Sequence, residues 1–132
     1  MGIPSGLHRM RLMIVGDMAV VREGVRLLLS DEPEVDVVAE ARNGEEALRL
    51  MAQAGLDVIL IDIDPPGGDG LTVIPQIKAH ANPPGIVVMS IHAGDAGRRR
   101  VREAGVDHFL DKCHLPAEVM LALRDALRPR AA

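Results

Sequence analysis

The chain is 132 residues long, with 48% hydrophobic residues, a formal net charge of −4 and one cysteine. This length suits one domain with its own core, and no apolar run approaches the length of a membrane span, so we expect a soluble protein. One cysteine excludes an internal disulfide and, without an apolar signal core at the start, favours the reducing cytoplasm, while the negative charge argues against this domain itself binding DNA phosphates.

Five short apolar runs alternate with five amphipathic segments. The runs are rich in β-branched residues and end at Gly, Pro, Asp or Ser, a pattern typical of buried strands. Apolar residues at helical spacing between them predict helices, with Pro75 tolerated only in the first turn of its helix. The predicted strands cover residues 10–15, 35–41, 56–61, 86–89 and 106–110, and the predicted helices cover 18–30, 44–53, 71–80, 95–103 and 114–128.

Strands that alternate with helices predict an α/β fold with a parallel sheet covered on both faces. For five strands and five helices we expect a single doubly wound sheet in the flavodoxin-like order 2-1-3-4-5, with residues 35–41 as an edge strand. The predicted domain spans residues 10–128, after a flexible extension over 1–9 and before a tail or linker start over 129–132. Ligands of such sheets bind at the carboxyl ends of the strands, between strands 1 and 3.

Polar residues follow four of the predicted strands: Asp17 the first, Asp62 the third, Ser90 the fourth and Lys112 the fifth. Two carboxylates at one sheet edge can hold Mg²⁺, and a carboxylate on a rigid turn can become an acyl phosphate. Lys112 would neutralise charge on a phosphoryl group, and Ser90 would donate a hydrogen bond to it. Plainer interpretations stay open, with Asp62 as a turn residue, Asp17 as a helix cap and Ser90 as a loop hydroxyl.

With these strand ends, the chain resembles the response-regulator receiver domains of bacterial two-component signalling. The resemblance covers Met10 to about Leu127. The matching residues are Asp17, the stretch from Asp62 to Gly70, Met89-Ser90 and Phe109-Leu110-Asp111-Lys112. The segments Val21-Arg22-Glu23-Gly24-Val25 and Val88-Met89-Ser90-Ile91-His92 are most similar to receivers that precede a LuxR-type helix-turn-helix domain.

The resemblance implies a phosphoprotein that receives phosphate from a histidine kinase in the presence of Mg²⁺ and controls transcription. It also implies a homodimer that contacts DNA only through a C-terminal domain absent from this chain, so we expect a receiver cut from a longer transcription factor. The implied roles are phosphoacceptor for Asp62, metal ligand for Asp17, Asp62 and the backbone carbonyl of Asp64, phosphate-binding lysine for Lys112, and switch pair for Ser90 and Phe109.

The sequence departs from the family at Gly16, where members usually carry a second acidic residue. Asp64 adds a carboxylate near the site, and its effect depends on where its side chain lies. We predict weaker Mg²⁺ binding and slower phosphorylation than in a typical member. Lys112 is followed by Cys113 rather than the common proline, so the sequence gives no reason to assume a cis peptide at this bond.

Outside the strand ends, Arg98-Arg99-Arg100 and Arg102 form a basic patch that is interpreted as a solvated helix face or as a partner surface. The histidines and the single cysteine lack the paired spacing of a zinc site. Cys113 is interpreted as an incidental thiol, open to modification only if Lys112 lowers its pKa.

Two other functions stay in competition with a phosphoryl-accepting module whose output surface is helix 4, strand 5 and helix 5. Asp62-Ile63-Asp64 is similar to the nucleophile strand of haloacid-dehalogenase-type phosphatases, although those enzymes place it on their first strand and need a longer chain. An atypical receiver that acts as a phosphorylation-independent dimerisation or docking module is the stronger alternative, because Gly16 removes an acid. We expect no enzyme activity beyond the domain's own phosphorylation and dephosphorylation.

Overall fold

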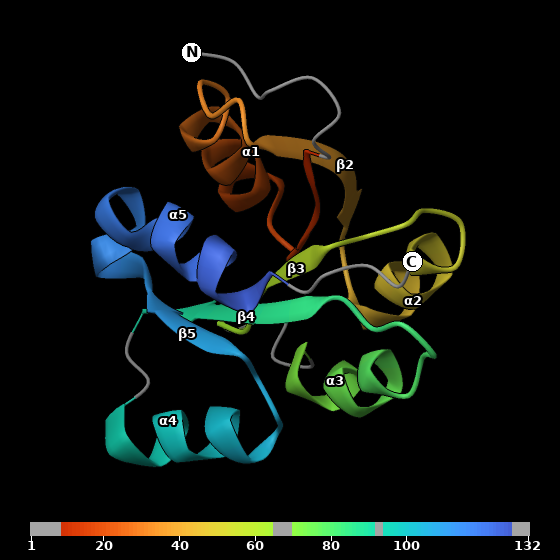
Figure 1. The fold of residues 1–132 in the computed structure, drawn as a ribbon. Helices are drawn as coiled ribbons and strands as arrows, with labels where there is room; N and C mark the ends of the chain where they lie inside the picture. Colours follow the sequence, from red (N-terminus) through yellow and green to blue (C-terminus); the bar gives the residue numbers. More distant parts are fainter. Residues whose placement is uncertain (1–8, 65–69, 92–93, 128–132) are drawn as a thin grey trace.

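Strands and helices alternate throughout the computed structural model, which describes residues 9–64, 70–91 and 94–127 (Figure 1). The predicted extension over 1–9 and the tail over 129–132 therefore lie outside the described residues, apart from Arg9. The strands are β1 (Met10–Val15), β2 (Val35–Ala41), β3 (Val58–Asp62), β4 (Gly85–Ser90) and β5 (His108–Asp111). The helices are α1 (Ala19–Leu28), α2 (Gly44–Met51), α3 (Gly70–Lys78), α4 (Gly94–Glu103) and α5 (Leu115–Ala126), with a 3-10 turn, η1, over Lys112–His114.

The five strands form one parallel sheet in the order β2-β1-β3-β4-β5, which confirms the predicted topology. β3 is central, and its residues Val58, Ile59, Leu60 and Ile61 are fully buried. β2 is an edge strand, as expected. Its pairing with β1 shifts by one residue, because Leu12 faces Val37 whereas Met13 faces Ala39.

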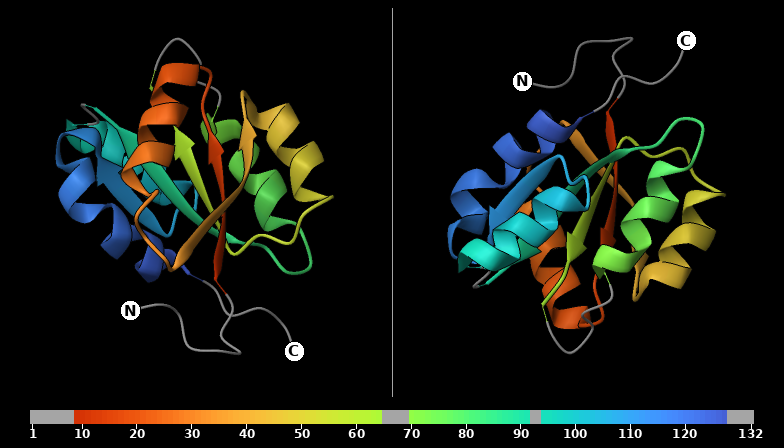
Figure 2. Two further views of the ribbon diagram at one scale, coloured as in Figure 1. Left: turned by 90° about the horizontal axis from the view of Figure 1, so that it is seen from above. Right: turned by 90° about the horizontal axis from the view of Figure 1, so that it is seen from below.

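Two apolar layers pack on opposite faces of the sheet, and the views in Figure 2 show helices on both sides. α1 and α5 cover one face, with Val25 and Leu123 among the buried residues. α2, α3 and α4 cover the other face, with Met51, Ile74 and Val101. None of the helices in the described part of the chain is long and apolar enough to cross a membrane.

Pro75 lies inside α3 rather than in its first turn, so this detail of the prediction was wrong. A proline there removes one helical hydrogen bond. The helix persists because its other face buries Val73, Ile74 and Ile77 against the sheet, and tertiary packing supplies most of the stability of such a short helix.

The amino ends of the strands are held by backbone contacts and close packing. The carboxylate of Asp57, which is 2% exposed, accepts the Arg11 N–H at 2.8 Å, and that of Asp107 accepts the Ile86 N–H at 2.8 Å. At Gly85, a Cβ atom would lie 1.7 Å from the carbonyl oxygen of Ala126 at the end of α5. Only glycine fits at this approach, so α5 ends directly against the start of β4.

Candidate functional site

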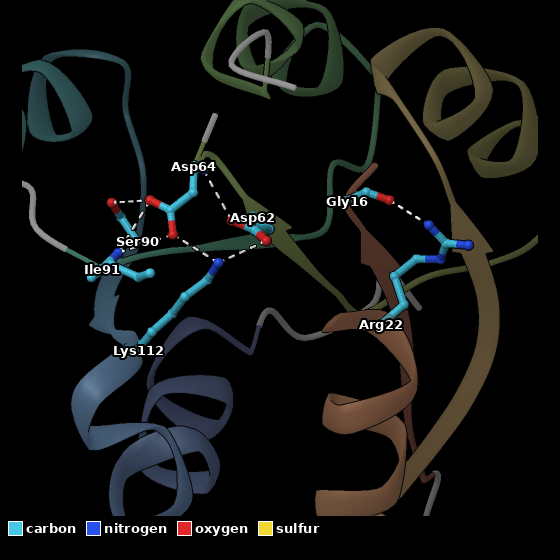
Figure 3. Close-up of polar contacts among 7 residues, drawn as sticks. All are labelled: Gly16, Arg22, Asp62, Asp64, Ser90, Ile91 and Lys112. Carbon is cyan, nitrogen blue, oxygen red and sulfur yellow. Dashed lines mark hydrogen bonds and ion pairs between the residues drawn. The ribbon is translucent and has the colours of Figure 1, made fainter. Parts of the chain in front are cut away.

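The carboxyl ends of the strands carry the four polar residues predicted from the sequence. Asp62 is the last residue of β3, Ser90 is the last residue of β4 and Lys112 directly follows β5. Figure 3 shows these three side chains gathered on one side of the sheet edge. Asp17 follows β1 at the same edge and is exposed to solvent.

Asp62 is held in place through both of its carboxylate oxygens. Oδ1 accepts the Asp64 backbone N–H at 3.0 Å, and Oδ2 accepts the Lys112 ammonium at 2.8 Å. The Asp62 side chain is only 6% exposed. One of its two donors is a backbone group and the other is a lysine side chain. Asp62 is thus a fixed carboxylate at the end of a buried strand, which is the setting that a nucleophilic carboxylate requires.

The side chain of Asp64 lies among the same donors. Its Oδ1 accepts the Ser90 hydroxyl at 2.7 Å, both of its oxygens lie 3.1 Å from the Ile91 backbone nitrogen, and Oδ2 lies 2.7 Å from Lys112 Nζ (Figure 3). The family resemblance implied a role for Asp64 only through its backbone carbonyl. Because β3 pairs with β4 so that Asp62 faces Met89, the next residues along each strand are neighbours, and this register explains the contact.

Two carboxylates therefore share one ammonium group. Burial raises the pKa of Asp64, but hydrogen bonds from Lys112, Ser90 and Ile91 outweigh burial, and the pKa lies below its ordinary value. For Lys112 burial lowers the pKa, and the two carboxylates outweigh it, so the pKa is raised. These directions of the two pKa values favour the charged forms of Asp64 and Lys112.

Gly16, where an acidic residue was expected from the family pattern, lies against Asp62. A Cβ atom at Gly16 would be 3.2 Å from the Asp62 Cβ, so a side chain would fit after a small shift. The Gly16 carbonyl accepts a hydrogen bond from Arg22 Nη1 at 2.6 Å (Figure 3). Arg22 Nε also pairs with Glu40 at 3.2 Å. Sequence reasoning missed Arg22 as part of this edge, since an arginine on an amphipathic helix has no distinctive pattern.

No three Asp, Glu, His or Cys side chains come together as a metal cluster within residues 9–64, 70–91 and 94–127. Mg²⁺ does not need such a cluster, because one or two carboxylates with water and phosphate oxygens complete its shell. The residues present fit this minimal requirement, with Asp62 fixed at the edge and Asp17 on the neighbouring strand end. The paired histidine–cysteine spacing of zinc sites is absent from the sequence as well.

Phe109, the predicted switch partner of Ser90, lies half-buried against the layer that α4 covers. The guanidinium carbon of Arg98 lies 4.7 Å from the centre of its ring, a cation–π distance. One arginine of the basic patch therefore packs on the only aromatic residue of the chain rather than serving as a purely solvated group.

Cys113 is exposed, and its pKa is raised by a hydrogen bond to Asp111 and by the charge of that carboxylate. The condition under which Cys113 was expected to be open to modification, a pKa lowered by Lys112, is therefore not met. Lys112 is committed to two carboxylates, and Asp111 is the charged group that acts on the thiol.

The family model for the response regulator receiver domain matches residues 12–124. The transcriptional regulatory protein LiaR of Bacillus subtilis is 34% identical over 116 residues, which cover 88% of this chain and 55% of LiaR, so the chain spans about half of that relative. A LuxR-family response regulator from Aurantimonas has a similar solved structure, with a TM-score of 0.79 and 33% identity, over 89% of this chain and 84% of that one.

The isolated receiver domain of RcsB from Salmonella enterica, solved with the phosphomimetic BeF₃⁻, is also similar. Its TM-score is 0.78 at 26% identity, over 89% of this chain and 87% of that chain. The family-model match over residues 12–124 includes all four strand ends. The chain therefore belongs to the receiver-domain family of two-component response regulators, with LuxR-type regulators among its relatives.

Proposed function

We propose that this chain is a phosphoryl-accepting receiver in which Asp62 takes the phosphoryl group of a phosphohistidine on a histidine kinase. The observation that supports this most is the placement of the Asp62 carboxylate at the end of β3, 2.8 Å from the Lys112 ammonium. Ser90 follows on the neighbouring strand. The domain acts on its own carboxylate only, so its chemistry is its own phosphorylation and dephosphorylation.

In the transfer, a carboxylate oxygen of Asp62 forms a bond to phosphorus while the bond from phosphorus to the donor imidazole nitrogen breaks. The imidazole leaves with the electron pair and takes up a proton. Lys112 neutralises charge on the phosphoryl oxygens, and Ser90 donates its hydroxyl to one of them. The aspartyl phosphate then carries new negative charge at the end of β3, next to the end of β4, where the segment that leads to α4 begins.

Asp17, Asp62 and the backbone carbonyl of Asp64 are the residues that would hold Mg²⁺, which neutralises phosphoryl charge when bound. Gly16 contributes no carboxylate to this group. We therefore expect weaker Mg²⁺ binding and slower phosphorylation than in receivers with an acid at this position.

The proposed output is a changed surface over α4, β5 and α5, in which Ser90 and Phe109 report the phosphoryl group. We place the protein in the bacterial cytoplasm, as a homodimer whose longer form controls transcription through a C-terminal DNA-binding domain. Support comes from LiaR, named a transcriptional regulatory protein, and from RcsB, solved as two dimers bound to two parallel DNAs.

Intact-mass measurement after incubation with a small phosphodonor and Mg²⁺ tests the proposal. The wild type should gain the mass of one phosphoryl group, Asp62→Asn should gain none, and Asp31→Asn, at the opposite edge of the sheet, should behave as the wild type. Failure of the wild type to gain mass at any Mg²⁺ concentration would favour the alternative, a docking or dimerisation module that works without phosphate. Gly16 is the observation that favours this alternative.

A further inference from the structure

We infer that the carboxylate of Asp64 is an internal anion that occupies the phosphoryl-binding donors before any phosphoryl group arrives. It holds Ser90, Ile91 and Lys112 in the arrangement that they adopt around a bound anion. The inference rests on the proposed function for the identity of the competing ligand, a phosphoryl group on Asp62. The contacts of Asp64 itself are independent of that proposal.

The donors at this edge converge on Asp64. A hydroxyl, a backbone N–H and an ammonium, which come from the end of β4, the residue after it and the residue after β5, all contact one carboxylate at 2.7 to 3.1 Å. Ser90 is 6% exposed, so water has little access to its hydroxyl. Three donors that close on two oxygens form the kind of anion site that a phosphoryl group also uses.

The occupant differs from a free ligand because it is part of the chain. Asp64 lies two residues beyond Asp62, so its effective concentration at the donors is set by the chain and not by any solute. Its side chain is 17% exposed. A phosphoryl group on Asp62 would have to displace it from Ser90 and Ile91. It would also enter a site where two carboxylates already share one lysine.

The internal anion affects both affinity and movement at the site. The apparent affinity of the site for an external anion is reduced by the fraction of molecules in which Asp64 has left the donors. In addition, the Ser90–Ile91 segment at the end of β4 is already drawn to an anion in the unphosphorylated protein. A phosphoryl group therefore exchanges one anion for another at this segment, and the movement that it can produce there is small.

The test is a titration with BeF₃⁻ at saturating Mg²⁺, followed by the backbone amide resonances of the wild type, Asp64→Ala, Asp64→Asn and Asp31→Ala. Asp64→Ala removes the carboxylate but keeps the backbone carbonyl, and Asp64→Asn keeps the shape in case the alanine variant folds poorly. Asp31→Ala removes an exposed carboxylate at the amino edge and is the matched control for charge.

We expect BeF₃⁻ to bind Asp64→Ala about tenfold more tightly than the wild type, which corresponds to free donors in about one wild-type molecule in ten. The affinity of Asp64→Asn should lie between the two, and Asp31→Ala should bind like the wild type. The Ile91 amide should also shift further on BeF₃⁻ binding in Asp64→Ala than in the wild type, because only the variant starts with free donors.

Equal affinity and an equal Ile91 shift in wild type and Asp64→Ala would overturn the inference and leave Asp62 as the phosphoacceptor. A third outcome is that neither the wild type nor any variant binds BeF₃⁻, while Asp64→Ala moves the Ile91 amide resonance and Asp31→Ala does not. That result would support the internal anion and contradict the proposed function. An Ile91 resonance that neither substitution moves, without BeF₃⁻ binding, would overturn both.

Discussion

Aspartates line both edges of the central sheet, but different kinds of donor hold them. At the amino edge, Asp57 and Asp107 accept backbone N–H groups whose positions the sheet itself fixes. At the carboxyl edge, Asp62 and Asp64 each accept a backbone N–H too, but they also accept side-chain donors. Lys112 contacts both carboxylates, and the Ser90 hydroxyl contacts Asp64. The strand pairing fixes the backbone donors at the amino edge, whereas the Lys112 ammonium and the Ser90 hydroxyl at the carboxyl edge can turn to a new anion. The contacts at the amino edge therefore stabilise the fold, and those at the carboxyl edge can rearrange around a new anion.

The largest effect should come from Gly85→Ala at the amino edge, because the new Cβ would lie 1.7 Å from the Ala126 carbonyl oxygen. Neither group is a flexible side chain, so β4 or α5 must move. We expect the free energy of unfolding to fall by about 3 kcal/mol or more, measured by denaturant unfolding.

Gly24→Ala is the control for this substitution, since a Cβ there meets nothing within 4 Å and the residue lies within α1. It should raise the free energy of unfolding by up to about 1 kcal/mol, the helix preference of alanine over glycine. A similar loss of stability in both variants would show that the contact with α5 is not the cause.

Asp57→Ala should cost about 1–3 kcal/mol, because the Arg11 N–H loses a buried acceptor. Phosphorylation measured by intact mass should persist. Asp62→Asn should show the reverse, with a much smaller change in denaturant unfolding and complete loss of the mass gain. If Asp62→Asn destabilised the domain as much as Asp57→Ala, the contrast between the two edges would be wrong.

Gly16→Asp should bring the carboxyl edge closer to the usual family pattern and tighten Mg²⁺ binding by about tenfold. A Cβ atom at this position would lie 3.2 Å from the Asp62 Cβ, a tight contact that requires Asp62 to shift by a few tenths of an ångström. Calorimetric titration with Mg²⁺ measures the change, and Gly16→Asn, which adds the same volume without the charge, should show little of it. An unchanged affinity in Gly16→Asp would count against the predicted weakness of the native site.

The smallest effect should appear in acid. The lowered pKa of Asp64 means that its charged form stabilises the fold above the ordinary pKa of aspartate, and that this contribution is lost as the pH falls through the lowered value. The stability of the wild type relative to Asp64→Asn should therefore decrease below about pH 4. Denaturant unfolding over this range checks the sign, and a difference that does not vary with pH would contradict it.

The sheet order and the meeting of Asp62, Ser90 and Lys112 were predictable, because strand periodicity and the geometry of parallel sheets fix both. The orientation of the Asp64 side chain was not, since it depends on where the chain turns after β3 relative to Ser90. Arg22 was missed for a similar reason, because its target is a backbone carbonyl that no sequence pattern marks. The roles of the strand-end residues in phosphoryl transfer stay predictions. The position of Pro75 was predicted wrongly because the burial of Val73, Ile74 and Ile77 outweighs the cost of a proline inside α3.

The one-residue shift between β1 and β2 has a consequence for the other side of the site. Val38 is the extra residue: Val37, before it, packs on the layer beneath α1 and α5, whereas Ala39, after it, packs on the opposite layer. The alternation is thereby inverted, and Glu40 lies on the side of α1, where it pairs with Arg22. Deletion of Val38 would restore regular alternation and keep Glu40 on the side of α1. A strand that kept Val38 but paired without the shift would instead turn Glu40 toward α2 and leave Arg22, the residue that holds the Gly16 carbonyl, without this carboxylate.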